Sequence, residues 1–247
     1  MKNFKIKIQY DGTKYNGWQR QKNTKNTIQE KFESVLSLMC GHNVEIFASG
    51  RTDAGVHAEC QVANFKCSTE KSLDEIKDYL NHYLPQDILV TSIEEMGERF
   101  HSRLNAVSKT YEYTIAIEKP DVFMRKYVYF EKACPDVEKM KEVSRVFLGT
   151  HDFLGFSSVG KTKKSTVRTI NFIDIKEAHG LIKIKINANG FLYNMVRIIA
   201  GTIFDAGKGR ISANDIENIF NAKIRANAGT TLPACGLKLI EVFYKEQ

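Results

Sequence analysis

The sequence contains few cysteines, and those it has are scattered. None of the five cysteines forms a C-x-x-C pair, so we expect neither a disulfide framework nor a zinc knuckle. Reduced thiols are usual in the cytosol, and we therefore expect the protein to be cytoplasmic. No stretch approaches the roughly 18–20 apolar residues that a membrane-spanning helix needs. The sequence thus predicts no disulfide, no zinc site and no membrane partner.

The N-terminus also lacks the apolar core of a secretory signal peptide. Phe4, Ile6 and Ile8 instead alternate with lysines, which is typical of a half-buried β-strand. Only four prolines are present, and 43% of the 247 residues are hydrophobic, which excludes a disordered, collagen-like or low-complexity chain. A chain of this length is sufficient for one large domain or two small ones.

Positive charge is in modest excess. Lysine and arginine number 36, whereas aspartate and glutamate number 29, which gives a net charge of +7. This excess favours an anionic partner such as a nucleic acid or a phosphate compound. The sequence has neither a P-loop nor the glycine-rich fingerprint of a dinucleotide site, so it gives no sign of a nucleotide cofactor.

Hydrophobic periodicity and turn residues predict a mixture of strands and helices. Strands are indicated near residues 4–8, 44–48, 61–65, 88–93, 111–117, 127–130, 166–175, 181–188 and 236–244. Helical spacing, capping boxes at Thr27 and Ser72 and a C-cap at Gly41 indicate helices near 28–39, 72–84, 137–147, 191–205 and 212–222.

Each half of the chain combines antiparallel-looking strands with at least two helices. This order resembles two split-βαβ units of the ferredoxin-like type, which is an α+β fold. We expect subdomains at residues 1–104 and 105–247. They are expected to share a large, mostly antiparallel sheet, with helices on one face and a central catalytic cleft.

One short segment concentrates the residues of a reactive site. Gly50–His57 joins two of the expected strands and places Arg51 and Asp53 between two glycines. A carboxylate on such a loop is able to act as a nucleophile, a general base or a metal ligand. The alternative from these residues alone is a turn closed by Asp53 with a solvated Arg51. His57 is the one further metal-ligand side chain in the segment, so we predict no metal site. We expect His57 instead to be packed or bonded to the loop.

The segment Gly50–Ala58 and a series of shorter motifs form a pattern across nearly the whole chain. The shorter motifs are Tyr10–Thr13, Tyr15–Gln21, Phe100–Arg103, Lys109–Tyr113, Gly149–Phe153, Arg168–Ile170, Phe191–Arg197 and Gly236–Leu237. In this order they resemble the bacterial tRNA pseudouridine synthase A family. The resemblance implies an enzyme that breaks the N1–C1′ bond of uridine, turns the base and joins C5 to C1′. This isomerisation involves no redox change and no group donor, so the resemblance also implies that no cofactor is needed.

The resemblance assigns the role of catalytic aspartate to Asp53. Three routes stay open, namely attack of the carboxylate on C1′, its addition to C6, or removal of the C2′ proton. Each route requires an ionised carboxylate and therefore a cationic partner. Arg197 matches the basic residue of the family that pairs with this aspartate. The helical pattern alone favours an exposed surface arginine at this position.

The other implied site residues contact RNA. Tyr111 matches the active-site tyrosine that stacks on the target base and takes part in the proton transfer. Tyr113 lies two residues further along the same strand face, and we expect one of the two tyrosines to be a packing residue. Arg51 matches an arginine that helps to extrude the base from its stack. Phosphate contacts are expected from the basic cluster Lys161, Lys163, Lys164 and Arg168.

The sequence therefore predicts a cofactor-free tRNA pseudouridine synthase that acts on uridines 38, 39 and 40 of the anticodon stem-loop. The resemblance further implies a homodimer whose partner is the anticodon arm of tRNA. Two alternatives stay open, a paralogue that modifies ribosomal RNA and a non-catalytic RNA-binding module on the same fold. The joint presence of Asp53, Arg197 and Tyr111 argues against a loss of catalysis.

Overall fold

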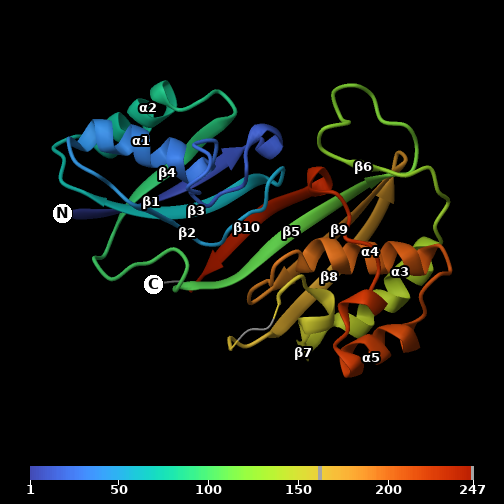
Figure 1. Cartoon of the computed structure of the whole chain (residues 1–247). Helices are drawn as coiled ribbons and strands as arrows, with labels where there is room; N and C mark the ends of the chain where they lie inside the picture. Colours follow the sequence, from blue (N-terminus) through green and yellow to red (C-terminus); the bar gives the residue numbers. More distant parts are fainter. Residues whose placement is uncertain (161–162, 246–247) are drawn as a thin grey trace. The chain divides into compact units, whose positions relative to one another are not determined.

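The computed structural model describes residues 1–160 and 163–245 of the chain and divides into two compact units. Unit 1 is formed by Met1–Val107 together with the end of the chain from Lys238. Unit 2 is formed by Ser108–Leu237. Figure 1 shows the course of the chain through both units.

The end of the chain returns to the unit in which the chain begins. Its strand β10 (Leu237–Tyr244) pairs with β3 (His57–Cys67) in parallel, with Lys238 opposite His57. The sequence pattern places this segment in the C-terminal subdomain, 105–247. In the structure it is part of unit 1, because its backbone hydrogen bonds are made to β3.

The sheet of unit 1 is mostly antiparallel. Its other strands are β1 (Lys2–Tyr10), β2 (Ile46–Ala48) and β4 (Ile88–Met96). The order is β4-β1-β3-β10, and β2 pairs with β3. Phe4, Ile6 and Ile8 of β1 are all buried. This confirms the predicted alternation, because successive side chains of a strand point to opposite faces.

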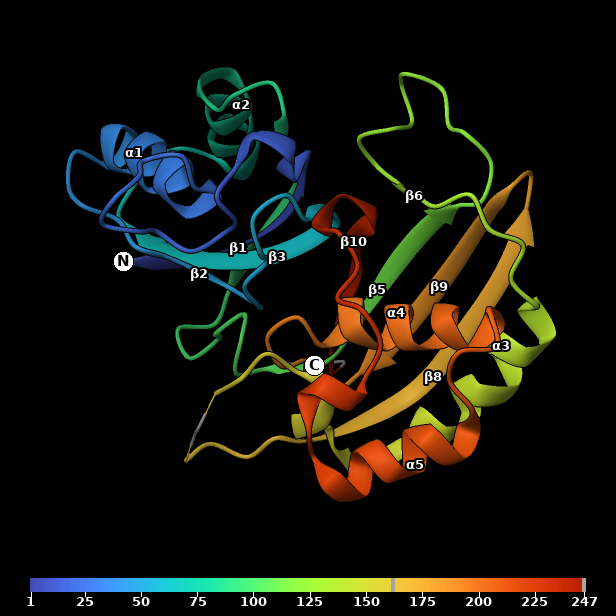
Figure 2. The same cartoon turned by 45° about the vertical axis from the view of Figure 1, so that its right-hand side comes forward.

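Two helices, α1 (Ile28–Cys40) and α2 (Leu73–Tyr83), lie on the same side of this sheet in both views (Figure 1 and Figure 2). Thr27 caps the start of α1, and Gly41 ends it with a left-handed φ of 70°. The predicted capping box at Ser72 is present at the start of α2. The order β1-α1-β2-β3-α2-β4 is that of a ferredoxin-like split-βαβ unit, as predicted.

Unit 2 is built around a second antiparallel series of strands. These are β5 (Ala106–Ala116), β7 (Gly149–Asp152), β8 (Val167–Ala178) and β9 (Leu181–Ala188), with the short β6 (Tyr129–Phe130). The order is β5-β9-β8-β7, and β6 pairs with β5 in parallel. Its helices are α3 (Val137–Ser144), α4 (Met195–Gly207) and α5 (Ala213–Ala222). Both units thus mix strands and helices, and the predicted α+β class is confirmed.

The helix α4 crosses the face of the strands of unit 2 (Figure 2) and packs against α3. Every residue of α4 except Arg197 is buried. The sequence predicts that this helix begins near residue 191, but it begins at Met195. The reason is the backbone of Asn194, which has a left-handed φ of 60° and therefore ends the helical geometry on the N-terminal side.

Short 3₁₀ helices connect these elements at Gly12–Lys14, Arg145–Phe147, Phe153–Phe156, Arg225–Asn227 and Ala234–Gly236. The first lies in unit 1 and the other four lie in unit 2. Across residues 1–160 and 163–245, no helix combines the length and the apolar character that crossing a membrane requires.

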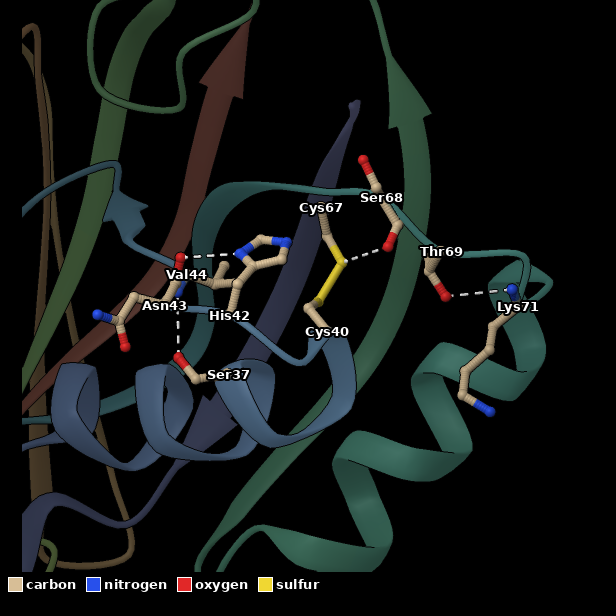
Figure 3. Close-up of a disulfide and its surroundings, with 9 residues drawn as sticks. All are labelled: Ser37, Cys40, His42, Asn43, Val44, Cys67, Ser68, Thr69 and Lys71. Atoms are coloured by element: carbon tan, nitrogen blue, oxygen red, sulfur yellow. Dashed lines mark hydrogen bonds between the residues drawn. A yellow bond between two sulfur atoms is a disulfide. The ribbon is translucent and has the colours of Figure 1, made fainter.

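A disulfide joins Cys40, the last residue of α1, to Cys67, the last residue of β3 (Figure 3). The expectation of reduced cysteines without a disulfide is therefore wrong for this pair. No local pattern marks the two residues, because 27 positions separate them along the chain. Only the packing of α1 on the sheet brings their Cα atoms to 6.4 Å, a separation typical of disulfides.

We expect Cys40→Ser to lower the free energy of unfolding by about 2–4 kcal/mol, because a crosslink restricts the unfolded chain. Urea unfolding without reductant measures the change. Cys134→Ser, at an exposed free cysteine, is the matched control and should leave the unfolding curve unchanged. A reducing agent should shift the curve of the natural chain but not that of Cys40→Ser. Identical curves for the natural chain with and without reductant would contradict the prediction.

Candidate active site

Asp53 lies on the loop of unit 1 that leads from β2 into β3, and its side chain is half-buried. Its backbone carbonyl accepts a hydrogen bond from the Val56 N–H at 3.1 Å, which closes a turn. The preceding carbonyl, that of Thr52, accepts one from the Trp18 N–H at 3.0 Å. The loop is therefore fixed through its backbone on both sides of Asp53, and the carboxylate is presented on a rigid support.

Two glycines of the segment between β1 and α1 allow that segment to lie directly against the backbone of the Asp53 loop. A Cβ atom on Gly12 would lie 2.0 Å from the Val56 carbonyl oxygen. A Cβ atom on Gly17 would lie 2.7 Å from the Thr52 carbonyl oxygen, and the φ of Gly17 is +87°. Neither position has room for a side chain. The opening motif of the sequence, Tyr10–Thr13 with Tyr15–Gln21, thus supports the Asp53 loop.

Hydrogen bonds from buried polar side chains also hold the Asp53 loop in place. The Tyr10 hydroxyl and the Thr52 hydroxyl form a hydrogen bond of 2.8 Å. The Gln61 amide donates to the Gly50 carbonyl at 2.9 Å. Burial raises the pKa of Tyr10 to about 12, against the lowering effect of its hydrogen bonds to Thr52 and Gln61. Tyr10 therefore stays neutral at physiological pH and contributes a fixed hydrogen bond.

His57 is a structural residue of this loop. It is buried, and its Nδ1 accepts a hydrogen bond from the Gly12 N–H at 3.1 Å. This confirms the expectation of a packed, loop-bonded histidine. Within the part of the chain that the structure describes, no group of three or more histidine, cysteine, aspartate or glutamate side chains is placed to hold a metal ion.

We expect Gly12→Ala to destabilise unit 1 by about 1–3 kcal/mol, the usual cost of forcing an atom into a packed site. The added methyl group must displace the backbone at Val56 and with it the Asp53 loop, so activity should fall as well. Thermal and urea unfolding measure the first effect. Gly97→Ala is the control, because no atom lies within 4 Å of a Cβ at that position. Equal stability of the two variants would contradict the close packing of Gly12.

Tyr111 and Tyr113 of β5 have different surroundings. The Tyr111 ring is buried and meets the Phe191 ring edge-on, with centroids 5.1 Å apart. Tyr113 is fully buried, and its hydroxyl donates to the Pro233 carbonyl at 2.7 Å. Burial also raises the pKa of Tyr113 far above its ordinary value. Of the two, Tyr113 is therefore the packing residue that the sequence leads one to expect.

Arg197 is the one residue of α4 that is not buried, and its side chain is anchored. Its Nε donates to the Leu232 carbonyl at 2.6 Å, and its Nη1 donates to the Asn194 side-chain oxygen at 2.9 Å. The alternative of an ordinary surface arginine is therefore wrong. A surface arginine belongs to an amphipathic helix, whereas α4 is enclosed at every other position.

The basic residues that the sequence predicts to contact RNA differ in their exposure to solvent. Arg51 on the Asp53 loop is exposed, as are Lys163 and Lys164. Lys161 lies outside the described residues. Arg168 is instead half-buried, and its Nη1 donates to the Ser165 carbonyl at 3.0 Å and to the Val167 carbonyl at 2.7 Å. Arg168 therefore braces its own loop, and burial lowers its pKa.

The site residues fall into two groups. Asp53 and Arg51 belong to unit 1, whereas Tyr111, Arg197 and the basic cluster belong to unit 2. Sequence reasoning missed the supports of both groups, namely Tyr10, Thr52, Gln61, Asn194 and the Leu232 carbonyl. The signal that the sequence offered for these supports was the pair Gly12 and Gly17, since a glycine permits another backbone segment to approach closely.

A family model and several relatives of the chain carry the same family name. The family model described as "tRNA pseudouridine synthase" matches residues 6–105 and 143–245. "tRNA pseudouridine synthase A 1" of Clostridium tetani is 46% identical over 245 residues, covering 99% of this chain and 100% of that protein. "tRNA pseudouridine synthase A" of Bacillus sp. strain KSM-64 is 48% identical over 231 residues, covering 93% and 94%. "tRNA pseudouridine synthase A 2" of Bacillus cereus strain ZK / E33L is 44% identical over 243 residues, covering 98% and 99%.

Proposed function

Because the chain belongs to the tRNA pseudouridine synthase family, we propose that it isomerises uridines 38, 39 and 40 of the tRNA anticodon stem-loop through the carboxylate of Asp53. The observation that carries the proposal is the Asp53 loop. Its backbone is held by the Trp18 and Val56 N–H groups, and its side chain is half-exposed. Such a loop offers a preorganised carboxylate to a ligand, as catalysis requires.

The reaction is an internal rearrangement of the nucleoside. The N1–C1′ bond breaks, C5 bonds to C1′, the C5 proton leaves and N1 takes up a proton. No electron is transferred to or from another compound, so we propose that the enzyme needs no cofactor. The carboxylate of Asp53 attacks C1′, adds to C6 or removes the C2′ proton. All three routes need it ionised.

We propose that Arg197 is the cation that keeps Asp53 ionised. A guanidinium next to a carboxylate favours its charged form. In this proposal unit 1 supplies the carboxylate, and unit 2 supplies the guanidinium and Tyr111. The hydrogen bonds from Nε and Nη1 of the Arg197 guanidinium support this role, because they fix its orientation.

We propose that Tyr111 and the exposed side chains of Arg51, Lys163 and Lys164 bind the RNA. A flipped uracil stacks on the ring of Tyr111, a contact worth about 1–3 kcal/mol for a base on an aromatic side chain. Arg51 occupies the space that the base leaves in the stem. Lys163 and Lys164 bind phosphates, so affinity should fall steeply with salt. Arg168 contributes by bracing the loop that carries them.

The test uses tRNA carrying tritium at C5 of uridine, since the label leaves when C5 bonds to C1′. The purified protein should release it without added metal or nucleotide. A tRNA with cytidine at positions 38, 39 and 40 should release none. Release from that substituted tRNA would contradict the proposed positions. Salt-sensitive binding without any release would favour the non-catalytic RNA-binding module.

Two relatives carry the numbers 1 and 2 in their names, which keeps a paralogue acting on ribosomal RNA as the second candidate. Mapping pseudouridines in the RNA of cells with and without this protein separates the two targets. Loss at tRNA positions 38, 39 and 40 supports the proposal, whereas loss in ribosomal RNA favours the paralogue. We further propose a cytoplasmic homodimer in which one tRNA contacts both subunits.

A further inference from the structure

The start of α4 has an unusual cap. Asn194 occupies the N-cap position with a left-handed backbone, φ 60° and ψ 3°. An N-cap asparagine normally adopts an extended backbone and turns its side-chain oxygen to the first backbone N–H groups of the helix. The side chain of Asn194 makes no such capping bond. Its amide is therefore used for something other than the helix end.

The amide of Asn194 bridges two other side chains. Its oxygen accepts a hydrogen bond from Nη1 of Arg197 at 2.9 Å. Its nitrogen donates to the Ser158 hydroxyl at 3.1 Å, and the Ser158 N–H donates to the Tyr193 carbonyl at 3.0 Å. The amide of Asn194 thus links Ser158 to Arg197, which lies about one helical turn further along.

A second anchor fixes the other edge of the guanidinium. Nε of Arg197 donates to the Leu232 carbonyl at 2.6 Å. The segment that carries this carbonyl is itself pressed onto α4. A Cβ atom on Gly201 would lie 1.9 Å from the Thr230 carbonyl oxygen, and the Gly229 N–H donates to the Thr202 hydroxyl at 3.0 Å.

We propose that Asn194 is a positioning residue for catalysis, which sets the plane and direction of the Arg197 guanidinium together with the Leu232 carbonyl. The inference rests on the proposed role of Arg197 in the active site. A planar guanidinium held at both Nε and Nη1 has no freedom to rotate about its side-chain bonds. Its remaining nitrogen, Nη2, then points in one fixed direction, as preorganised electrostatic stabilisation requires.

The decisive variant is Asn194→Gly. Glycine accepts a left-handed φ without strain and is nearly as good an N-cap as asparagine, so the helix stays intact while the amide is lost. We expect kcat to fall roughly 10- to 100-fold, the range for a hydrogen bond to a charged group. The Kd for tRNA should change by less than about threefold, since phosphate contacts carry affinity.

Asn194→Asp is the conservative variant. Aspartate also tolerates the left-handed region and keeps an oxygen acceptor for Nη1, so we expect it to retain most of the activity that Asn194→Gly loses. Ser158→Ala removes the other hydrogen bond of the amide and leaves the acceptor for Arg197 in place. A loss of kcat in Ser158→Ala as large as that in Asn194→Gly would overturn the assignment to Arg197.

A double-mutant cycle tests whether Asn194 acts through Arg197. In an Arg197→Met background, Asn194→Gly should cause no further loss of kcat. An equal loss in both backgrounds would overturn the proposal, because the effect of Asn194 would then be independent of the guanidinium.

A readout without activity separates this inference from the proposed function. The ¹H–¹⁵N resonance of Arg197 Nε is assigned by its absence in Arg197→Met. In the natural protein it should exchange slowly with water, and in Asn194→Gly it should broaden or exchange faster. An unchanged resonance would refute positioning even if the enzyme is active. A changed resonance in a protein without tritium release would support positioning while the proposed function fails.

Discussion

Asp53→Asn is expected to abolish tritium release from C5-labelled tRNA, with a loss of at least about 10⁴-fold, as for removal of a catalytic nucleophile. The amide has the shape of the carboxylate but cannot attack C1′, add to C6 or accept the C2′ proton. The loop should keep its form, because the Trp18 and Val56 N–H groups bond to backbone carbonyls and not to the replaced group.

Thermal unfolding and tRNA binding complete this experiment. Both should be close to those of the natural protein, which confines the loss to the chemical step. Asp74→Asn is the matched control, since Asp74 is an exposed aspartate of α2 whose side chain is 91% accessible. It should leave the release unchanged. Substantial release by Asp53→Asn would remove every mechanism in which this carboxylate reacts or takes a proton.

Arg197→Met should reduce kcat by about 10²–10³-fold, the equivalent of roughly 3–4 kcal/mol, because the cation proposed to keep Asp53 ionised is lost. Methionine fills much of the same volume, so the enclosed helix α4 should remain packed. Binding of tRNA should weaken far less than catalysis, because one cation among many contributes modestly to phosphate affinity. Single-turnover rates and a binding titration measure the two effects separately.

Two further variants sharpen this result. Arg197→Lys keeps the charge but cannot bond the Leu232 carbonyl and the Asn194 oxygen in one fixed plane, so an intermediate kcat is expected. Arg145→Met, at an exposed arginine, is the control and should behave like the natural protein. If Arg197→Met weakened binding and catalysis equally, Arg197 would be a phosphate contact.

Features encoded by neighbouring residues were predictable from the sequence. The alternation of β1 and the caps at Thr27, Gly41 and Ser72 depend on residues a few positions apart, and the structure confirms them. The order of strands and helices followed from the same signals. These features give the α+β class of both units without any tertiary information.

Features that depend on distant residues were not predictable in the same way. The disulfide between Cys40 and Cys67 exists only because α1 packs on the sheet. The start of α4 was placed too early because Asn194 adopts a conformation that few residues other than glycine adopt. Family motifs predicted Asp53 and Arg197 as site residues, but the groups that hold them are recognisable only in three dimensions.

The disulfide also closes a ring around the support of the Asp53 loop. The first residue of α1, Ile28, donates its N–H to the Gly17 carbonyl, and the first residue of β3, His57, is bonded to Gly12. The disulfide joins the last residues of α1 and β3, the two elements whose first residues bond to this support. Enzyme handled in air and enzyme kept with thiols are consequently two covalent species, and rates or melting points from one should not be assigned to the other.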